Sequence, residues 1–135
     1  TSPAPASQPA ARDVTPPVTL VNVRRRQRLR TLRRRGASVR LRCLEGCVIR
    51  SRLEVSRRTA RKLGLRVTAG GAVVVGRGET LALTRAASTG FRLRLSRRAN
   101  GRLRRVRALR LTLRIASTDA GGNTRIVKRT IAARR

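Results

Sequence analysis

A strict alternation of aliphatic and polar residues near the C-terminal end constrains the fold of this chain more than any other feature. Between residues 108 and 116 every second side chain is a large aliphatic one: Leu109, Leu111, Leu113 and Ile115. A period of two is typical of a β-strand with one buried and one solvent-exposed face. Residues 117–124 contain Asp, Asn and two adjacent glycines, which predict a turn before a second strand that carries Ile126, Val127 and Ile131. We therefore expect a strand pair against which the rest of the chain packs.

Shorter alternating stretches, separated by glycines, recur along the chain at intervals of about ten residues. The expected strands cover residues 18–23, 39–43, 47–55, 73–75, 81–83, 91–95, 108–116 and 126–131, and residues 65–67 are also expected to be extended. We expect a hairpin around residues 43–47 and a second strand pair, 73–75 with 81–83, around 76–78. Short helical turns are expected at 57–63 and 97–106, each after a capping serine, and a helical turn or basic loop at 24–35 is expected to end at Gly36. The pattern predicts an all-β, antiparallel β-sandwich.

Two segments resemble bacterial immunoglobulin-like modules of secreted and cell-surface proteins, particularly those of high-GC Gram-positive bacteria. Residues 13–17 (Asp-Val-Thr-Pro-Pro) resemble the Asp-x-Thr-x-Pro sequence that often opens such modules, and residues 118–123 (Thr-Asp-Ala-Gly-Gly-Asn) resemble their last turn. The resemblance covers residues 13–132 in layout and implies an immunoglobulin-like sandwich of about seven or eight strands. The chain lacks the core Trp, the Tyr corner and the long-range Cys pair of antibody domains, so the resemblance does not give the strand order.

The distribution of proline predicts two parts in the chain. All five prolines lie within the first 17 residues, so we expect residues 1–16 to be a flexible leader or linker and residues 17–135 to form one domain. The core must be aliphatic, because Phe91 is the only aromatic residue. No stretch reaches the roughly 18 apolar residues of a membrane span. The sequence begins with Thr1, and we expect either a mature form after signal cleavage or a trimmed chain.

The two cysteines, Cys43 and Cys47, are separated by three residues. A zinc site needs about four Cys or His ligands and the chain has no His, so a complete site within the chain is excluded. A thioredoxin-type pair has two intervening residues. We therefore expect a disulfide that pins the turn, and with it an oxidising compartment.

The remaining polar groups do not suggest catalysis or cofactor binding. With no His and five carboxylates, neither a Ser-His-Asp nor a Cys-His arrangement can be assembled, and we expect no enzyme activity and no cofactor. Asp119 and Asn123 could contribute oxygens to a Ca²⁺ site, which needs six or more ligands. We interpret them, with Gly121 and Gly122, as a structural turn and expect no bound metal.

The net charge of +30 favours partners that are polyanions, such as nucleic acid, anionic wall polymers or acidic lipid surfaces. The alternative is that a high-GC genome over-supplies arginine codons and that strands place Arg on solvent-exposed faces at little cost. Arginine runs also occur at 57–58, 97–98, 102–105 and 134–135. The candidate polyanion contacts are Arg24, Arg25, Arg26, Arg33, Arg34, Arg35, Arg92, Arg94, Arg110 and Arg114.

Three functions are compatible with these features. We expect a secreted, non-enzymatic structural or adhesive module, such as a subunit of a surface fibre, whose Arg-rich surface contacts anionic polymers. Self-association would use edge strands or the N-terminal segment, with Val18, Leu20, Val21 and Val23 as the candidate assembly strand. The alternative is a basic protein dedicated to nucleic acid, although the chain has no zinc-finger, RNP or helix-turn-helix signature. No small-molecule substrate is expected.

Overall fold

The computed structural model describes residues 19–67 and 70–135. The predicted leader, residues 1–16, and Val18 lie outside this part of the chain. The strands are β1 (Thr19–Val23), β2 (Arg26–Arg28), β3 (Ala37–Cys43), β4 (Cys47–Val55), β5 (Val73–Arg77), β6 (Leu81–Leu83), β7 (Ala87–Leu93), β8 (Ala108–Asp119) and β9 (Thr124–Arg134). The helices are α1 (Leu29–Arg35), α2 (Arg57–Lys62) and α3 (Arg97–Arg102), the last followed by a 3₁₀ turn (Leu103–Arg105).

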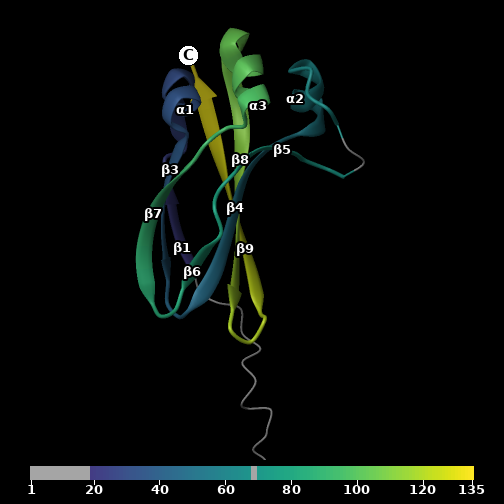
Figure 1. Ribbon diagram of the computed structural model, residues 1–135. Coiled ribbons are helices and arrows are strands. Elements are labelled where there is room, and N and C mark those ends of the chain that lie inside the picture. Colours follow the sequence, from purple (N-terminus) through teal and green to yellow (C-terminus); the bar gives the residue numbers. More distant parts are fainter. Residues whose placement is uncertain (1–18, 68–69) are drawn as a thin grey trace, which may run out of the picture.

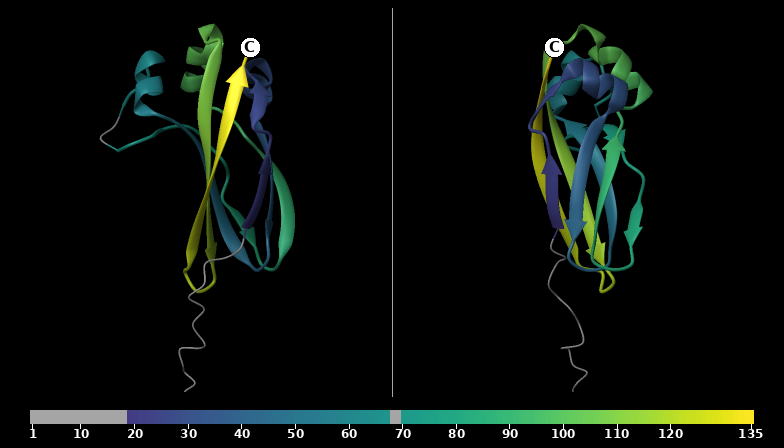
Figure 2. Two further views of the ribbon diagram at one scale, coloured as in Figure 1. Left: turned by 180° about the vertical axis from the view of Figure 1, so that it is seen from behind. Right: turned by 90° about the vertical axis from the view of Figure 1, so that its left-hand side faces the viewer.

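The strands form two sheets that face each other, as the sequence predicts for a β-sandwich (Figures 1 and 2). The small sheet has the order β1-β3-β7 and the large sheet the order β2-β9-β8-β4-β5, with β6 also paired to β4. The chain crosses from the small sheet to the large sheet between β1 and β2. β1 pairs with β3 of the small sheet in antiparallel orientation, and β2 pairs with β9 of the large sheet in parallel orientation. The three helices lie at one end of the sandwich, together with the C-terminus (Figure 1).

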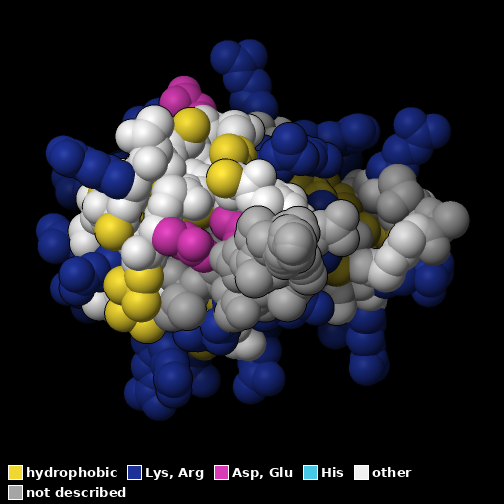
Figure 3. Space-filling view, turned by 90° about the horizontal axis from the view of Figure 1, so that it is seen from below, with side chains coloured by type: hydrophobic (Ala, Val, Ile, Leu, Met, Phe, Trp, Pro, Cys, Tyr) yellow, Lys and Arg dark blue, Asp and Glu magenta, His cyan; other side chains and the backbone are white. Residues whose placement is uncertain are grey.

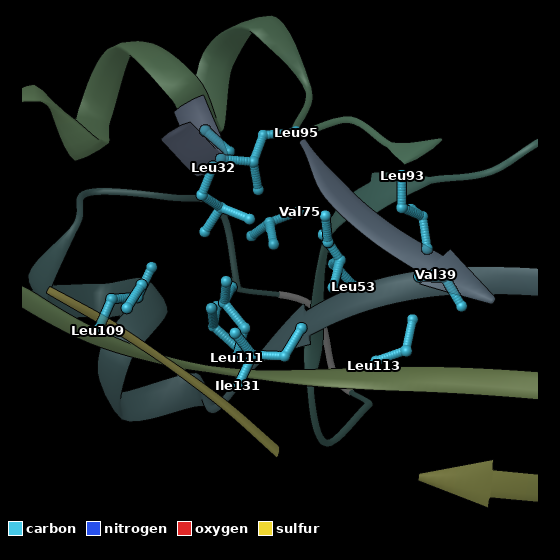
Figure 4. Close-up of a cluster of buried hydrophobic side chains, with 14 of the residues drawn as sticks. Leu32, Val39, Leu53, Val75, Leu93, Leu95, Leu109, Leu111, Leu113 and Ile131 are labelled. Atoms are coloured by element: carbon cyan, nitrogen blue, oxygen red, sulfur yellow. The ribbon is translucent and has the colours of Figure 1, made fainter. Parts of the chain in front are cut away.

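The core consists of aliphatic side chains from both sheets (Figure 4). The alternation in β8 has the predicted result, since Leu109, Leu111, Leu113 and Ile115 are buried and pack with residues of the small sheet such as Val39 and Leu93. Phe91, the only aromatic residue, is partly buried against this cluster. Leucine, isoleucine and valine therefore fill the space between the sheets without a large aromatic side chain.

Local signals fix the ends of the helices as predicted. The Ser56 Oγ accepts the backbone N–H of Thr59 (3.1 Å) and caps α2, and the Ser96 Oγ accepts the backbone N–H of Ala99 (3.2 Å) and caps α3. These bonds satisfy helix N–H groups that have no partner within the helix. Gly64, with φ +70°, follows the last turn of α2.

Two predictions about strand pairing are wrong. Cys43 and Cys47 do not close a hairpin, because β3 and β4 belong to different sheets and the turn between them is an arch. β5 and β6 do not pair with each other, because each pairs with a different part of β4. Residues 65–67 belong to no strand. A period of two is the same for a strand that pairs with its neighbour and for one that faces it across the core, so alternation alone does not identify the partner.

Candidate polyanion-binding groove

Helix α1 supplies four arginines at the helical end of the sandwich. It is anchored by Leu29 and Leu32, which are three residues apart and buried in the core. Gly36 ends the helix with φ +78°, and its N–H donates to the Leu32 carbonyl (2.9 Å). The arginines of the last turn are favourable there, because the C-terminal end of a helix carries partial negative charge. Because Leu29 and Leu32 lie on the same side of α1, that side faces the core and the arginines face outward.

A hollow of about 730 Å³ lies between α1 and α3. The two helices are joined by reciprocal hydrogen bonds, in which the Arg33 Nε donates to the Asn100 Oδ1 (3.0 Å) and the Asn100 Nδ2 donates to the Arg33 carbonyl (2.8 Å). The hollow is lined by Arg28, Leu29, Arg30, Arg33, Arg34, Asn100, Leu103, Arg104 and Arg135.

A second hollow of about 990 Å³ lies on the other side of α1, where the edges of the two sheets meet. It is lined by side chains of the segment that connects β1 to β2, of α1, of the outer face of the small sheet and of the end of β9. Its basic lining residues are Arg24, Arg26, Arg28, Arg35, Arg40, Arg92, Arg134 and Arg135. Arg28 and Arg135 line both hollows, so the two are adjacent, and we call them together the arginine groove.

The arginine groove has no Asp or Glu among its lining residues. Between described residues the structure has one ion pair, Arg52 Nε to Glu54 Oε2 at 2.7 Å, and it lies outside the groove. The guanidinium groups of the groove therefore have no acidic partner among the described residues. Arginine carries five N–H donors in a planar fork that fits carboxylate and phosphate oxygens. The groove can consequently hold anionic oxygens along its length.

The structure brings together part of the predicted set of arginines. Six of the ten candidates line the groove: Arg24, Arg26, Arg33, Arg34, Arg35 and Arg92. Arg25 is exposed at the crossing, and its carbonyl accepts the N–H of Ala132 (2.6 Å). Arg94 is exposed beyond β7, Arg110 lines a separate hollow beside α2, and Arg114 lies on the outer face of β8. The predicted contacts thus divide between the groove and other surfaces.

Other arginines of the groove were not among the predicted contacts. Arg134, Arg135 and Arg104 belong to runs that the sequence makes visible. Arg28, Arg30 and Arg40 stand alone between other residues, and the fold alone brings them beside α1. The alternation of Arg40 with the buried Val39 and Leu41 was the available signal, since it assigns Arg40 to an outer sheet face.

The opposite end of the sandwich has a different character (Figure 3). Viewed from that end, basic side chains project around the periphery, and acidic and hydrophobic side chains lie exposed between them. Glu45 lies in the arch between β3 and β4, and Asp119 lies at the turn between β8 and β9. Acidic side chains therefore occur at this end, whereas none lines the arginine groove at the helical end.

The turn between β8 and β9 is held by Asp119, whose carboxylate accepts the N–H of Asn123 (2.9 Å) and its Nδ2 (3.2 Å). Gly122 has φ +83°, and Gly121 precedes it in the turn. Within residues 19–67 and 70–135, no group of three or more His, Cys, Asp and Glu side chains could hold a metal ion. These contacts give Asp119 and Asn123 a role in shaping the turn.

Cys43 and Cys47 form a disulfide, with an S–S distance of 2.10 Å and a Cα–Cα distance of 6.8 Å. Both residues are buried, and the bond joins the end of β3 to the start of β4. It therefore ties the two sheets together at the arch, where the sequence predicted the tip of a hairpin. Thr19 lies beside it, with its Oγ1 at 3.7 Å from the Cys43 Sγ and donating to the Ser117 Oγ (2.8 Å).

The predicted assembly strand coincides with β1, an edge strand of the small sheet. Val21 and Val23 are partly buried against the core, whereas Leu20 points outward and is 58% exposed. β1 pairs with β3 over its whole length. Its valines therefore stabilise the chain's own sandwich, and of the described candidates only Leu20 is a large exposed apolar side chain.

Comparison with known proteins gives no relative: no protein-family model, no curated protein and no solved structure matches the chain. In the part of the chain that the structure describes, no helix has the length and apolar character needed to cross a membrane.

Proposed function

We propose that this chain is a non-enzymatic, immunoglobulin-like adhesive module, secreted or exposed on a cell surface, that holds an anionic surface polymer in its arginine groove. The observation that carries this proposal is the convergence of arginines from several elements on two adjacent hollows that no Asp or Glu side chain lines. Composition alone would distribute such residues over the whole surface. A groove of one charge sign raises the local concentration of a ligand of the opposite sign.

The strand connections support the immunoglobulin-like assignment. In that fold the strands A, B and E lie in one sheet, and C, F and G lie in the other. Here β1, β3 and β7 form the small sheet, and β4, β8 and β9 are consecutive neighbours in the large one. With β1 as A, β3 as B, β4 as C, β7 as E, β8 as F and β9 as G, the order of these six strands agrees, and the small sheet of the described residues has no counterpart of strand D.

The disulfide supports an extracellular location. Disulfides persist in oxidising environments and are rare in a reducing cytosol. The Cys43–Cys47 bond is buried at the arch, and both cysteines face the core as part of the packing. A buried structural disulfide of this kind belongs with secretion or surface exposure.

The chemistry of the groove supports binding without catalysis. Its lining includes the hydroxyl groups of Thr31 and Ser38, but none of its residues is a His, Cys, Lys, Asp or Glu that could act as a general base. It also has no aromatic side chain on which a nucleobase could stack, since Phe91 packs against the core. Recognition by charge alone favours a polymer such as a poly(glycerol phosphate) over a nucleic acid read through its bases.

The proposal is tested with two triple variants of equal charge. R30Q/R34Q/R35Q removes three exposed arginines of α1, which line the groove. R57Q/R58Q/R61Q removes three exposed arginines of α2, which lie outside it. Fluorescence anisotropy of labelled poly(glycerol phosphate) is measured over a series of salt concentrations, after circular dichroism has shown that both variants are folded.

The α1 variant should bind at least about tenfold more weakly. Its negative slope of log K against log salt should become shallower by about 2, as expected for three lost phosphate contacts. The α2 variant should lose less than about threefold, through the weaker long-range field. Equal losses in the two variants would show that net charge alone attracts the polymer. Tighter binding of an oligo(dT) with the same number of phosphates would replace the surface-polymer function with nucleic-acid binding.

A further inference from the structure

A second cationic surface lies on the outer face of the large sheet. In the strand register, Lys128 of β9 is opposite Arg114 of β8, which is opposite Arg52 of β4, which is opposite Arg77 of β5. The four side chains thus form one line that runs across four neighbouring strands. We call this line the cationic row.

The cationic row is unfavourable in the isolated protein. Adjacent strands are about 4.8 Å apart, and like charges directly opposite each other on neighbouring strands are destabilising. Glu54 pairs with Arg52, with Oε2 at 2.7 Å from Nε. The other three members have no ion pair with a described residue. An external anion that lies along the row would relieve this repulsion.

The rows on either side of the cationic row are less basic. Thr130, Thr112 and Glu54 lie on one side, and Ile126, Ala116 and Arg50 lie on the other. The row is therefore the one line on this part of the sheet that has a basic side chain on each of four neighbouring strands. A linear anionic chain that crosses the strands can contact all four of these side chains.

The cationic row and the arginine groove are separate surfaces. Lys128 of the row and Arg134 of the groove are both on β9 and are six residues apart, which corresponds to about 20 Å along a strand. The groove also takes Arg40 and Arg92 from the outer face of the small sheet. The outer faces of two stacked sheets point in opposite directions (Figure 2).

We infer that one module bridges two anionic polymer chains, with one chain in the arginine groove and the other across the cationic row. This inference rests on the proposed function for the first chain. The second chain has the same chemistry, and its phosphate or carboxylate oxygens pair with Lys128, Arg114 and Arg77. Such a monomer cross-links polymer strands without self-association, which its high positive charge opposes.

The experiment uses a poly(glycerol phosphate) oligomer too short to reach both surfaces. Calorimetric titration should give two oligomers per protein for the wild type and one for R114Q/K128Q, which interrupts the row. The control R125Q/R129Q removes two exposed basic residues from the same hairpin without touching the row, and it should still bind two. R30Q/R34Q/R35Q should lose the groove site and bind one oligomer on the row.

A second readout measures bridging directly. A surface coated with long poly(glycerol phosphate) captures the protein, and a labelled second polymer is then added. The wild type should retain the label, whereas R114Q/K128Q should bind the coated surface within about twofold of the wild type and retain little label. A wild-type stoichiometry of one, or full retention by R114Q/K128Q, overturns the bridging inference and leaves the groove intact. Unchanged binding by R30Q/R34Q/R35Q overturns the proposed function instead, and no binding by the wild type overturns both.

Discussion

Ser51 is a polar residue whose removal should make the protein more stable. It occupies an inward position of β4, is only 7% exposed, and its Oγ has no hydrogen-bond partner among the described residues. A buried hydroxyl without a partner costs about 1–3 kcal/mol relative to water. Ser51→Ala removes that oxygen and keeps the Cβ, so we expect the free energy of unfolding to rise by about 1 kcal/mol.

Gly78 explains why the hydroxyl has so little space, and it gives a second test. A Cβ at Gly78 would overlap the Ser51 Oγ, whereas the next nearest atoms, the Leu93 Cγ at 3.6 Å and the Ser51 Cβ at 3.7 Å, are at ordinary contact distance. Gly78 does not have a positive φ. Gly78→Ala should therefore destabilise the wild type by about 1–2 kcal/mol through overpacking. In the Ser51→Ala background it should be neutral or slightly stabilising, because alanine restricts the unfolded chain.

The assay is thermal and urea unfolding followed by far-ultraviolet circular dichroism, since the chain has no Trp or Tyr. A change of 1 kcal/mol shifts the Tm of a domain of this size by about 4 °C. Ser88→Ala, on the exposed outer face of β7, makes the same chemical change at a solvated site and should leave the Tm unchanged. A lower Tm for Ser51→Ala, or additive effects of the two substitutions, would refute the assignment of Ser51 as a buried, unpaired hydroxyl in contact with Gly78.

Further predictions concern the links between the sheets and the helices. Gly36→Ala should cost more than about 3 kcal/mol, because φ is +78° and a Cβ would overlap the Leu93 carbonyl; urea unfolding measures this loss, and wild-type stability would refute it. Replacing Cys43 and Cys47 by Ala, which buries no new hydroxyl, should cost at least about 2 kcal/mol, the value for a loop this short, in the same assay. Asn100→Ala should cost about 1–3 kcal/mol by releasing α3 from α1, and hydrogen exchange should show faster opening of both helices and an unchanged β8.

Features that depend on neighbouring residues in the chain were predictable from the sequence. The caps at Ser56 and Ser96 involve a hydrogen bond to the residue three positions later, so the serine and the basic helical turn after it were sufficient. The alternation in β8 was similarly sufficient, because burial of one face follows directly from the period of two. Both signals are complete within a short segment.

Features that depend on the choice of strand partner were not predictable in this way. β3 has inward residues at every second position, and this is the same whether Cys43 ends one arm of a hairpin or one side of an arch. The groove has the same origin, since Arg40 and Arg92 reach it only because β3 pairs with β7 and Ser38 lies opposite Arg92. The arginine runs in the sequence predicted that α1 contributes to the groove. No pattern within a short segment predicts that arginines of several separate elements lie close together in the fold.

The arginine content itself has two origins that the structure separates. The first turns of α2 and α3 contain Arg57 with Arg58 and Arg97 with Arg98, and no acidic residue. Positive charge is unfavourable at a helix N-terminus. The arginines at these positions therefore reflect the high arginine content of the whole sequence and do not stabilise the helices. The total charge is therefore weak support for any function, whereas the groove and the cationic row are specific placements. The α2 triple variant measures the contribution of composition alone, and the difference between it and the α1 variant is the part of polymer binding that the fold provides.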